Sequence, residues 1–186
     1  MQPSSTELIL IRVTGEDRPG LTSSVTEILA KYDATILDIG QADIHNTLSL
    51  GILFKSEERH SGFIMKELLF KASSLGVTIR FEPITTEQYD NWVGMQGKNR
   101  YILTVLGRKL SARQISAATS VLAEQGMNID AIKRLTGRIP LDECDTDART
   151  RACIEFSVRG TPKDRIAMQE SLMKLALSLI HISEPT

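Results

Sequence analysis

The sequence contains little of what metal centres and covalent catalysis require. Its 186 residues include two cysteines and three histidines, whereas a structural zinc site takes four Cys or His ligands at recognisable spacing. We therefore expect no metal site. Neither His45 nor His60 has a nucleophile or an acid at the spacing of a catalytic motif, so both are interpreted as surface residues. Cys144 and Cys153 are close enough in the sequence to pair across a loop, but the thiols of a cytoplasmic protein stay reduced.

The chain also lacks a long hydrophobic run and an excess of charge. No apolar stretch approaches the roughly 20 residues that cross a bilayer, and residues 1–7 are too polar for a signal peptide. We therefore expect a cytoplasmic protein with no membrane partner. The 22 basic and 23 acidic side chains leave a formal charge of -1, which argues against nucleic-acid binding. The rest of the composition, 41% hydrophobic and 24% charged, is typical of a soluble globular protein.

An internal repeat organises the chain. Residues 9–15, an apolar run that ends in a glycine, match residues 101–107, and the alternating apolar positions of 50–54 match those of 154–158. In each copy the periodicity follows the order strand, helix, strand, strand, helix, strand. This order predicts the α+β class, with two ferredoxin-like βαββαβ modules that each have an antiparallel sheet and helices on one face.

Turn and cap residues indicate where the elements of the repeat begin and end. Pro19 suits the start of the first helix, where a missing N–H is harmless, and Gly76 suits the end of the second helix. In the second copy, Ser111 is expected to cap a helix that Gly126 closes. The elements predicted for the first copy are strands at 8–15, 35–44, 48–55 and 77–81, helices at 21–32 and about 64–75, and a hairpin turn at 45–47.

These patterns divide the chain into a first domain at 7–84 and a second domain at 100–176, joined by a polar linker at 85–99. In the linker, Tyr89 and Trp92 are expected to pack between the two copies rather than to bind a cofactor. We expect no cofactor in either domain.

Two segments of the second copy depart from the repeat. An insertion at about 138–150 contains Pro140 and several acids, which indicates a solvated loop. Its Asp145-Thr146-Asp147 superficially resembles the aspartate pair of haloacid-dehalogenase-type phosphatases, but no apolar strand precedes it, so we interpret it as part of the loop. Residues 177–186 resemble translated sequencing-adapter sequence and are interpreted as a non-native tail, although their composition suits the last strand of the repeat.

The strongest local signal is the loop between the first strand and the first helix, Gly15-Glu16-Asp17-Arg18-Pro19-Gly20-Leu21. A helix N-terminus presents free N–H groups and the positive end of the helix dipole, and both favour a carboxylate. Gly20 lets a ligand approach the backbone and Pro19 stiffens the loop. The same residues also make an ordinary tight turn, so physical chemistry alone leaves a binding site and a simple turn equally supported.

The repeat with this loop resembles the ACT domain family of regulatory modules that bind amino acids. The resemblance rests on Asp17-Arg18-Pro19-Gly20-Leu21 after the first strand and on residues 34–39 after the first helix, and it extends over about residues 7–176. The copies are most similar to the paired ACT domains at the N-terminus of bacterial phosphoserine phosphatases. The segments that carry this similarity are 39–44 and 49–54 in the first copy, and 126–130 and 151–162 in the second.

The resemblance implies a regulatory role in serine biosynthesis. Phosphoserine phosphatases remove phosphate from phosphoserine with a catalytic domain that follows the ACT pair and uses magnesium, and this sequence does not contain that domain. The chain is therefore expected to be a regulatory fragment and not an enzyme. It would need no magnesium itself and would bind L-serine or a related amino acid. Exposed sheet edges add the expectation of a homodimer.

In the ACT family, the strand-to-helix loop and the start of the second strand contact the ligand across an interface between modules. The second copy has Leu110-Ser111-Ala112 in place of the Pro-Gly turn, whereas the first has Thr35 where the second has Asn128. This implies a composite site, in which Gly20 and backbone N–H groups receive the carboxylate and the Asn128 amide meets the ligand's polar end. The implied ligand-binding residues are Asp17, Arg18, Pro19, Gly20, Leu21 and Thr22 from the first copy, and Asn128, Ile129 and Asp130 from the second.

Two other functions remain open. One is a free-standing tandem ACT regulator, similar to the repressor of the glycine cleavage system, that acts through a protein partner. A reading frame that continues into an apolar strand ending in Asp-x-Asp-x-Thr would exclude it. The other is a dimerisation module without a ligand, which is consistent with the incomplete motif of each copy.

Overall fold

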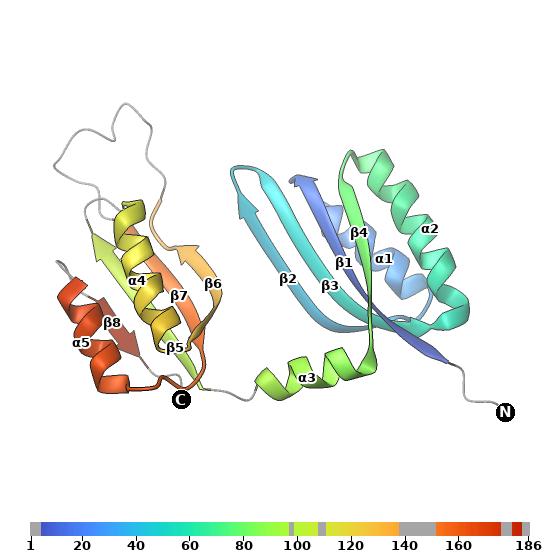
Figure 1. Ribbon diagram of the computed structural model, residues 1–186. Helices are drawn as coiled ribbons and strands as arrows, with labels where there is room; N and C mark the ends of the chain where they lie inside the picture. The colour runs from blue at the N-terminus through green and yellow to red at the C-terminus, as the bar shows by residue number, and fades with distance from the viewer. Residues whose placement is uncertain (1–4, 97–98, 108–110, 138–151, 176–179, 184–186) are drawn as a thin grey trace. The chain divides into compact units, whose positions relative to one another are not determined.

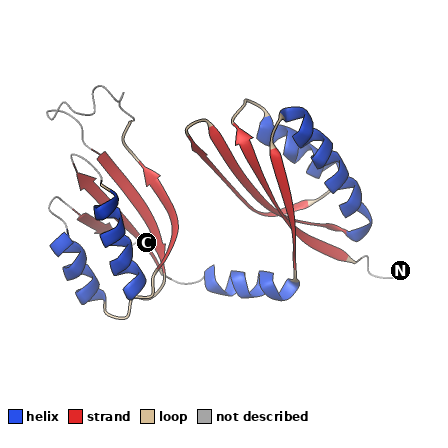
Figure 2. Cartoon of the chain, turned by 45° about the horizontal axis from the view of Figure 1, so that its top comes forward, coloured by secondary structure: helices blue, strands red, loops and turns tan. Residues whose placement is uncertain are grey.

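The structure is a computed structural model that describes residues 5–96, 99–107, 111–137, 152–175 and 180–183. The contacts divide the chain into two compact units, residues 1–94 and 95–186. Each unit has one four-stranded antiparallel sheet with two helices on one of its faces (Figures 1 and 2). The predicted fold, two βαββαβ modules, is therefore confirmed. Among the described residues, every helix is too short or too polar to cross a membrane.

The first sheet has the strand order β2-β3-β1-β4, with antiparallel neighbours throughout. Each helix connects two strands that are not neighbours in the sheet. The strand β3 lies between β1 and β2, which α1 connects, and β1 lies between β3 and β4, which α2 connects. The elements of this unit are β1 (Thr6–Glu16), α1 (Leu21–Lys31), β2 (Thr35–Ile44), β3 (Thr47–Glu57), α2 (Glu58–Leu75), β4 (Thr78–Ile84) and α3 (Thr86–Gln96).

Local backbone chemistry places the turns of this unit. His45 and Asn46 have φ of 53° and 59°, as both central residues of a type I′ turn do, so β2 and β3 form a tight hairpin. Gly76 ends α2 with φ of 68°, as predicted. Pro19 is not the first helical residue, because α1 begins at Leu21. Pro19 instead belongs to the turn that precedes the helix.

The first core lies between the sheet and the helices α1 and α2. Alternate residues of β1 and β3 face the helices and are almost fully buried, as the period-2 pattern predicts. Leu29 of α1 and Leu68 of α2 are each 1% exposed and close this core from the other side. Its buried strand residues are Ile9, Ile11, Val13, Leu48, Leu50, Ile52 and Phe54.

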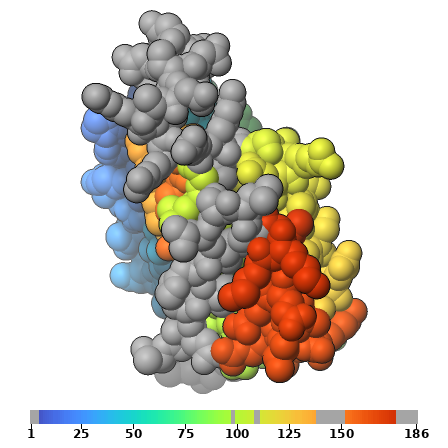
Figure 3. Space-filling model, turned by 90° about the vertical axis from the view of Figure 1, so that its left-hand side faces the viewer, coloured from blue at the N-terminus to red at the C-terminus, as the bar shows by residue number. Residues whose placement is uncertain are grey.

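The second unit repeats the arrangement with the strand order β6-β7-β5-β8. Ser111 caps α4 as predicted, and Gly126 has φ of 73° just beyond its end. The side chains of α5 lie beside those of α4 on the surface of this unit (Figure 3). The elements are β5 (Arg100–Gly107), α4 (Ala112–Glu124), β6 (Asn128–Arg134), β7 (Ala152–Arg159), α5 (Arg165–Leu175) and β8 (Ile180–Ser183).

The structure describes the predicted linker, part of the predicted tail and one of the two cysteines. The predicted polar linker forms the helix α3, and its Tyr89 and Trp92 line a pocket with residues of the first unit. Their packing between the copies stays a prediction. The strand β8 pairs with β5 inside the segment interpreted as a tail. Cys153 is buried as a free thiol. Cys144 and the predicted insertion at 138–150 lie outside the described residues.

Candidate functional site

The loop from β1 to α1 forms a type II turn. The N–H of Leu21 donates to the carbonyl oxygen of Arg18 over 3.2 Å, and Gly20 has φ of 86° and ψ of 0°. These are the angles of the third residue in a type II turn, which favours proline before it and glycine at that place. The Pro19-Gly20 pair therefore has a structural reason of its own. Gly20 has no side chain, and a Cβ built on it would meet nothing within 4 Å. The face of the turn at Gly20 is therefore open.

The turn leaves the N-terminus of α1 uncapped. Gly20 stands at the N-cap position without a side chain, and there is no acid in the first turn. Within the described residues, neither the N–H of Thr22 nor that of Ser23 has an acceptor, whereas the next one, Ser24, donates to the Gly20 carbonyl over 2.9 Å. Two free N–H groups and the positive end of the helix dipole are available for an anion here.

The matching helix in the second unit is closed by its own side chains. The Ser111 hydroxyl accepts from the Gln114 N–H over 3.3 Å, and the Gln114 amide oxygen accepts from the Ser111 N–H over 2.9 Å. This capping box satisfies the N–H of the third helical residue, Gln114, whose counterpart Ser23 is open in α1. The two copies therefore differ in a way that concentrates the anion-binding potential at α1.

Three interactions hold the loop in place. The Asp17 N–H donates to the Asn46 carbonyl over 2.8 Å, which ties the loop to the β2–β3 hairpin turn. The Thr22 hydroxyl donates to the Gln41 amide oxygen over 2.8 Å. Arg18 pairs with Glu16 at 2.9 Å, so part of its charge is neutralised. Gln41 was not among the predicted site residues. In the sequence, Gln41 could have been noticed as a polar residue at a position of β2 that faces the helices. The strand does not alternate regularly, so the sequence pattern did not show which face Gln41 takes.

That irregularity is a β-bulge that both copies share. The pairing of β2 with β3 shifts between Ile36 and Asp38, and that of β6 with β7 shifts between Ile129 and Ala131. Leu37 and Asp130 are the unpaired residues, and they occupy matching positions of the repeat. A bulge changes which face later residues take, so simple alternation mispredicts the side chains that follow.

The predicted residues of the second copy lie together at the start of β6. The Asn128 amide N–H donates to the Asp130 carboxylate over 2.9 Å, and Asp130 pairs with Arg159 at 3.0 Å. Ile129 is half-buried against the second core. The Arg159 side chain is 13% exposed and its Nη1 is buried with no acceptor among the described residues. Sequence reasoning missed Arg159, although Lys55 is its basic counterpart in the first copy.

The structure thus brings the predicted residues together in two groups. Asp17 to Gly20 form the loop of the first unit with Leu21 and Thr22 at the start of α1, and Asn128 to Asp130 form the start of β6 in the second. Each group belongs to its own unit, and a composite site that combines both groups stays a prediction. The described residues contain no group of three His, Cys, Asp or Glu side chains that could hold a metal ion.

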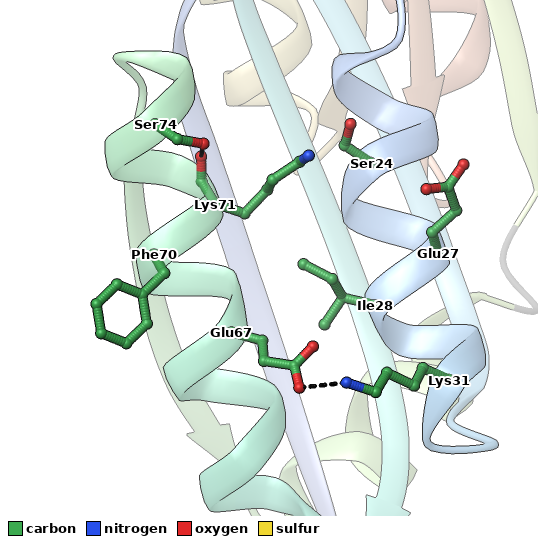
Figure 4. Close-up of a pocket in the computed structure, with 8 residues that line it drawn as sticks. All are labelled: Ser24, Glu27, Ile28, Lys31, Glu67, Phe70, Lys71 and Ser74. Atoms are coloured by element: carbon green, nitrogen blue, oxygen red, sulfur yellow. Dashed lines mark hydrogen bonds and ion pairs between the residues drawn. The ribbon is translucent and has the colours of Figure 1, made fainter.

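A hollow lies between α1 and α2 on the surface of the first unit (Figure 4). Its volume is about 490 Å³ and it is open to solvent. Lys31 pairs with Glu67 at 2.6 Å across it, and the Tyr32 hydroxyl donates to the same carboxylate. Hydrogen bonds from Lys31 and Tyr32 lower the pKa of Glu67, and the bond to Glu67 raises the pKa of both partners. Since lysines and glutamates alternate along this hollow, it favours no ligand of one charge.

The chain contains the same βαββαβ module twice, and the helix N-terminus after the first strand is open in the first copy and capped in the second. Residues 7–82 match one ACT domain family model and residues 100–145 match another. The chain belongs to the ACT domain family, whose members are regulatory modules.

Curated relatives include two phosphoserine phosphatases. The one from Streptomyces coelicolor is 31% identical over 160 residues, which cover 86% of this chain and 35% of the relative. The one from Mycobacterium tuberculosis is 30% identical over 129 residues, covering 69% of this chain and 31% of the relative. The chain therefore spans about a third of the length of these relatives.

Solved structures match the whole chain in fold. A protein from Galdieria sulphuraria, described as unknown, has a TM-score of 0.73 and 19% identity, and the match covers 98% of this chain and 100% of that one. A putative glycine cleavage system transcriptional repressor has a TM-score of 0.64 and 15% identity, with 97% and 96% covered. At these identities the likeness shows the fold alone.

Proposed function

We propose that this chain is the amino-acid-sensing region of a phosphoserine phosphatase and that it binds L-serine or a closely related amino acid. The observation that carries the proposal is the uncapped N-terminus of α1 behind the Gly20 turn. The ligand's carboxylate accepts hydrogen bonds from the N–H groups of Thr22 and Ser23. Because Gly20 has no side chain, the ligand can approach the backbone of the turn. The similarity to two phosphoserine phosphatases supports serine as the ligand.

The polar end of the amino acid has a candidate partner in the second unit. We propose that the Asn128 amide meets it, as in the composite arrangement implied by the family. One amide hydrogen of Asn128 is engaged by Asp130, which orients the side chain and leaves its oxygen and second hydrogen for a ligand.

The experiment is isothermal titration calorimetry of the purified chain with L-serine, with glycine and phosphoserine as comparators. The matched variants are Gly20→Leu and Gly76→Leu. Both glycines have positive φ and open space around a new Cβ, so each substitution costs about 1–2 kcal/mol of backbone strain. We expect Gly20→Leu to abolish serine binding and Gly76→Leu to keep it. Unchanged affinity in folded Gly20→Leu would contradict the proposed site.

A homodimer is part of the same proposal. In the order of the described strands, β2 stands at an edge of its sheet, and it carries exposed apolar residues, among them Ile39 at 49% and Ile44 at 73% exposure. In the second unit the edge strand β6 carries Ile132, which is 51% exposed. Exposed apolar edges favour pairing with another chain. Sedimentation velocity, run with and without L-serine, measures the mass of the particle in solution.

The second candidate is a free-standing tandem ACT regulator. The match that covers nearly all of this chain and of a putative glycine cleavage system repressor favours it. Glycine binding that exceeds serine binding in the same titration would support this candidate. A genomic reading frame that continues into an apolar strand ending in Asp-x-Asp-x-Thr would support the phosphatase instead. If the protein is folded and dimeric but no amino acid produces heat in the titration, the result would support the dimerisation module without a ligand.

A further inference from the structure

The helix-free face of the first sheet carries an apolar row at its middle. Leu53 of β3 and Leu10 of β1 are direct neighbours in the pairing register, and Asp38 of β2 stands next to Leu53 at the end of the same row. Ile84 of β4 lies in the adjacent row, opposite Leu8. Leu10 and Leu53 project away from the core, because the adjacent Ile9 and Ile52 take the helix side.

The helix α3 places two aromatic rings against this row. Tyr89 and Trp92 are three residues apart, so they share one face of the helix, and their ring centroids are 5.9 Å apart with planes inclined by 41°. Together with Gln88 and the row of the sheet they line a pocket of about 300 Å³. That volume is at the lower end of the range for small-molecule sites, and all of its lining residues lie within the first unit.

The charge balance of this face identifies the kind of ligand. Asp38 is the charged residue of the lining, and its carboxylate accepts the N–H of Ile39 over 3.0 Å. Among the described residues it has no ion pair, although Lys55 stands two residues along β3 on the same face. Glu82, at the other end of the same row, is neutralised by Arg12 at 2.8 Å. A carboxylate without an ion pair and two aromatic rings in the lining of one pocket are the groups that attract an organic cation.

We infer that this pocket binds a small organic amine. The protonated amino group pairs with the Asp38 carboxylate, and the hydrocarbon body lies between Leu10, Leu53 and the rings of Tyr89 and Trp92. The pocket is separate from the amino-acid site proposed above. Leu10 precedes Asp17 by seven residues of strand, which correspond to about 23 Å. The inference therefore stands or falls independently of serine binding.

The test uses the full chain and the fluorescence of Trp92, which is the sole tryptophan. The probe is 2-phenylethylamine, and the comparator is 3-phenylpropionate, which has the same ring and a similar chain but the opposite charge. We expect a saturable fluorescence change with the amine. The acid should bind at least about tenfold more weakly, because the Asp38 carboxylate attracts the ammonium group of the amine and repels the carboxylate of the acid.

Two matched substitutions on β2 test the role of the carboxylate. Asp38→Asn keeps the shape and the acceptor for Ile39, and we expect it to weaken amine binding at least about tenfold. Asp43→Asn removes an exposed acid from the same strand outside the pocket, and we expect no change. Calorimetry with Trp92→Leu, which lacks the fluorophore, should show loss of amine binding.

Three results would overturn the inference. The first is no saturable response to the amine, and the second is equal affinity for amine and acid, which would indicate an apolar pocket without charge selection. The third is an equal loss in Asp38→Asn and Asp43→Asn, which would indicate attraction by the general surface charge. Titration of the same variants with L-serine separates this site from the loop at Gly20, since Asp38→Asn should leave serine binding unchanged.

Discussion

The contact between Gly15 of β1 and Val77, the residue before β4, allows a test of what stabilises the first unit. A Cβ added to Gly15 would lie 2.7 Å from Cγ1, 3.0 Å from Cβ and 3.1 Å from Cα of Val77. Carbon atoms in contact prefer about 3.5–4.0 Å. Rotation of the Val77 side chain moves only Cγ1, so the backbone itself must shift. Gly15 therefore allows the close approach that positions the loop leading to Gly20.

The size of the effect follows from these distances. Overpacking of this kind costs about 1–3 kcal/mol, and the reduced freedom of the unfolded chain returns about 0.4–1 kcal/mol. We expect Gly15→Ala to lower the free energy of unfolding by about 1–2 kcal/mol, with a fall in Tm of about 4–8 °C for each kcal/mol in a unit of this size.

Urea unfolding followed by Trp92 fluorescence measures this effect in the first unit. Gly40→Ala is the matched control, because a Cβ there meets nothing within 4 Å, and we expect its free energy of unfolding to equal that of wild type or to exceed it by up to about 1 kcal/mol. The pair Gly15→Ala and Val77→Ala completes a double-mutant cycle with an expected coupling of about 1 kcal/mol. Gly15→Ala as stable as Gly40→Ala, or zero coupling with Val77, would refute the reasoning.

Two further predictions concern interactions on the helices. Glu67 has a lowered pKa, so its contribution to stability is present above its ordinary pKa of 4.5 and is lost as the pH falls through the lower folded value. Lys31 and Tyr32 have raised pKa values, so their contributions are present below 10.5 and 10.0 and are lost as the pH rises through the higher folded values. Ultraviolet titration of the tyrosines should show the Tyr32 pKa falling toward 10.0 in Glu67→Gln, and an unchanged titration would contradict the assigned contact. Ser111→Ala removes the capping box with Gln114 and should cost about 1 kcal/mol in chemical denaturation of the second unit, whereas no loss would mean that water caps α4 equally well.

The sequence by itself was sufficient for the architecture and for most element boundaries. The repeat predicted two βαββαβ modules, Gly76 and Ser111 marked helix ends, and the hairpin turn at His45 and Asn46 was placed correctly. These features depend on backbone preferences and on periodicities of two or 3.6 residues, which act over a few neighbouring positions. A reader of the sequence can therefore evaluate them without knowing the contacts of the fold.

Tertiary structure alone decided which distant residues meet. The bulge at Leu37 sets the face on which Asp38 and Gln41 stand, and pairing across strands then brings Asp38 beside Leu53 and the α3 helix. Arg159 likewise meets Asp130 through the register of two strands separated by the insertion. A shift of one residue exchanges the two faces of a strand, so contacts of this kind depend on the register of the whole sheet and on no local pattern.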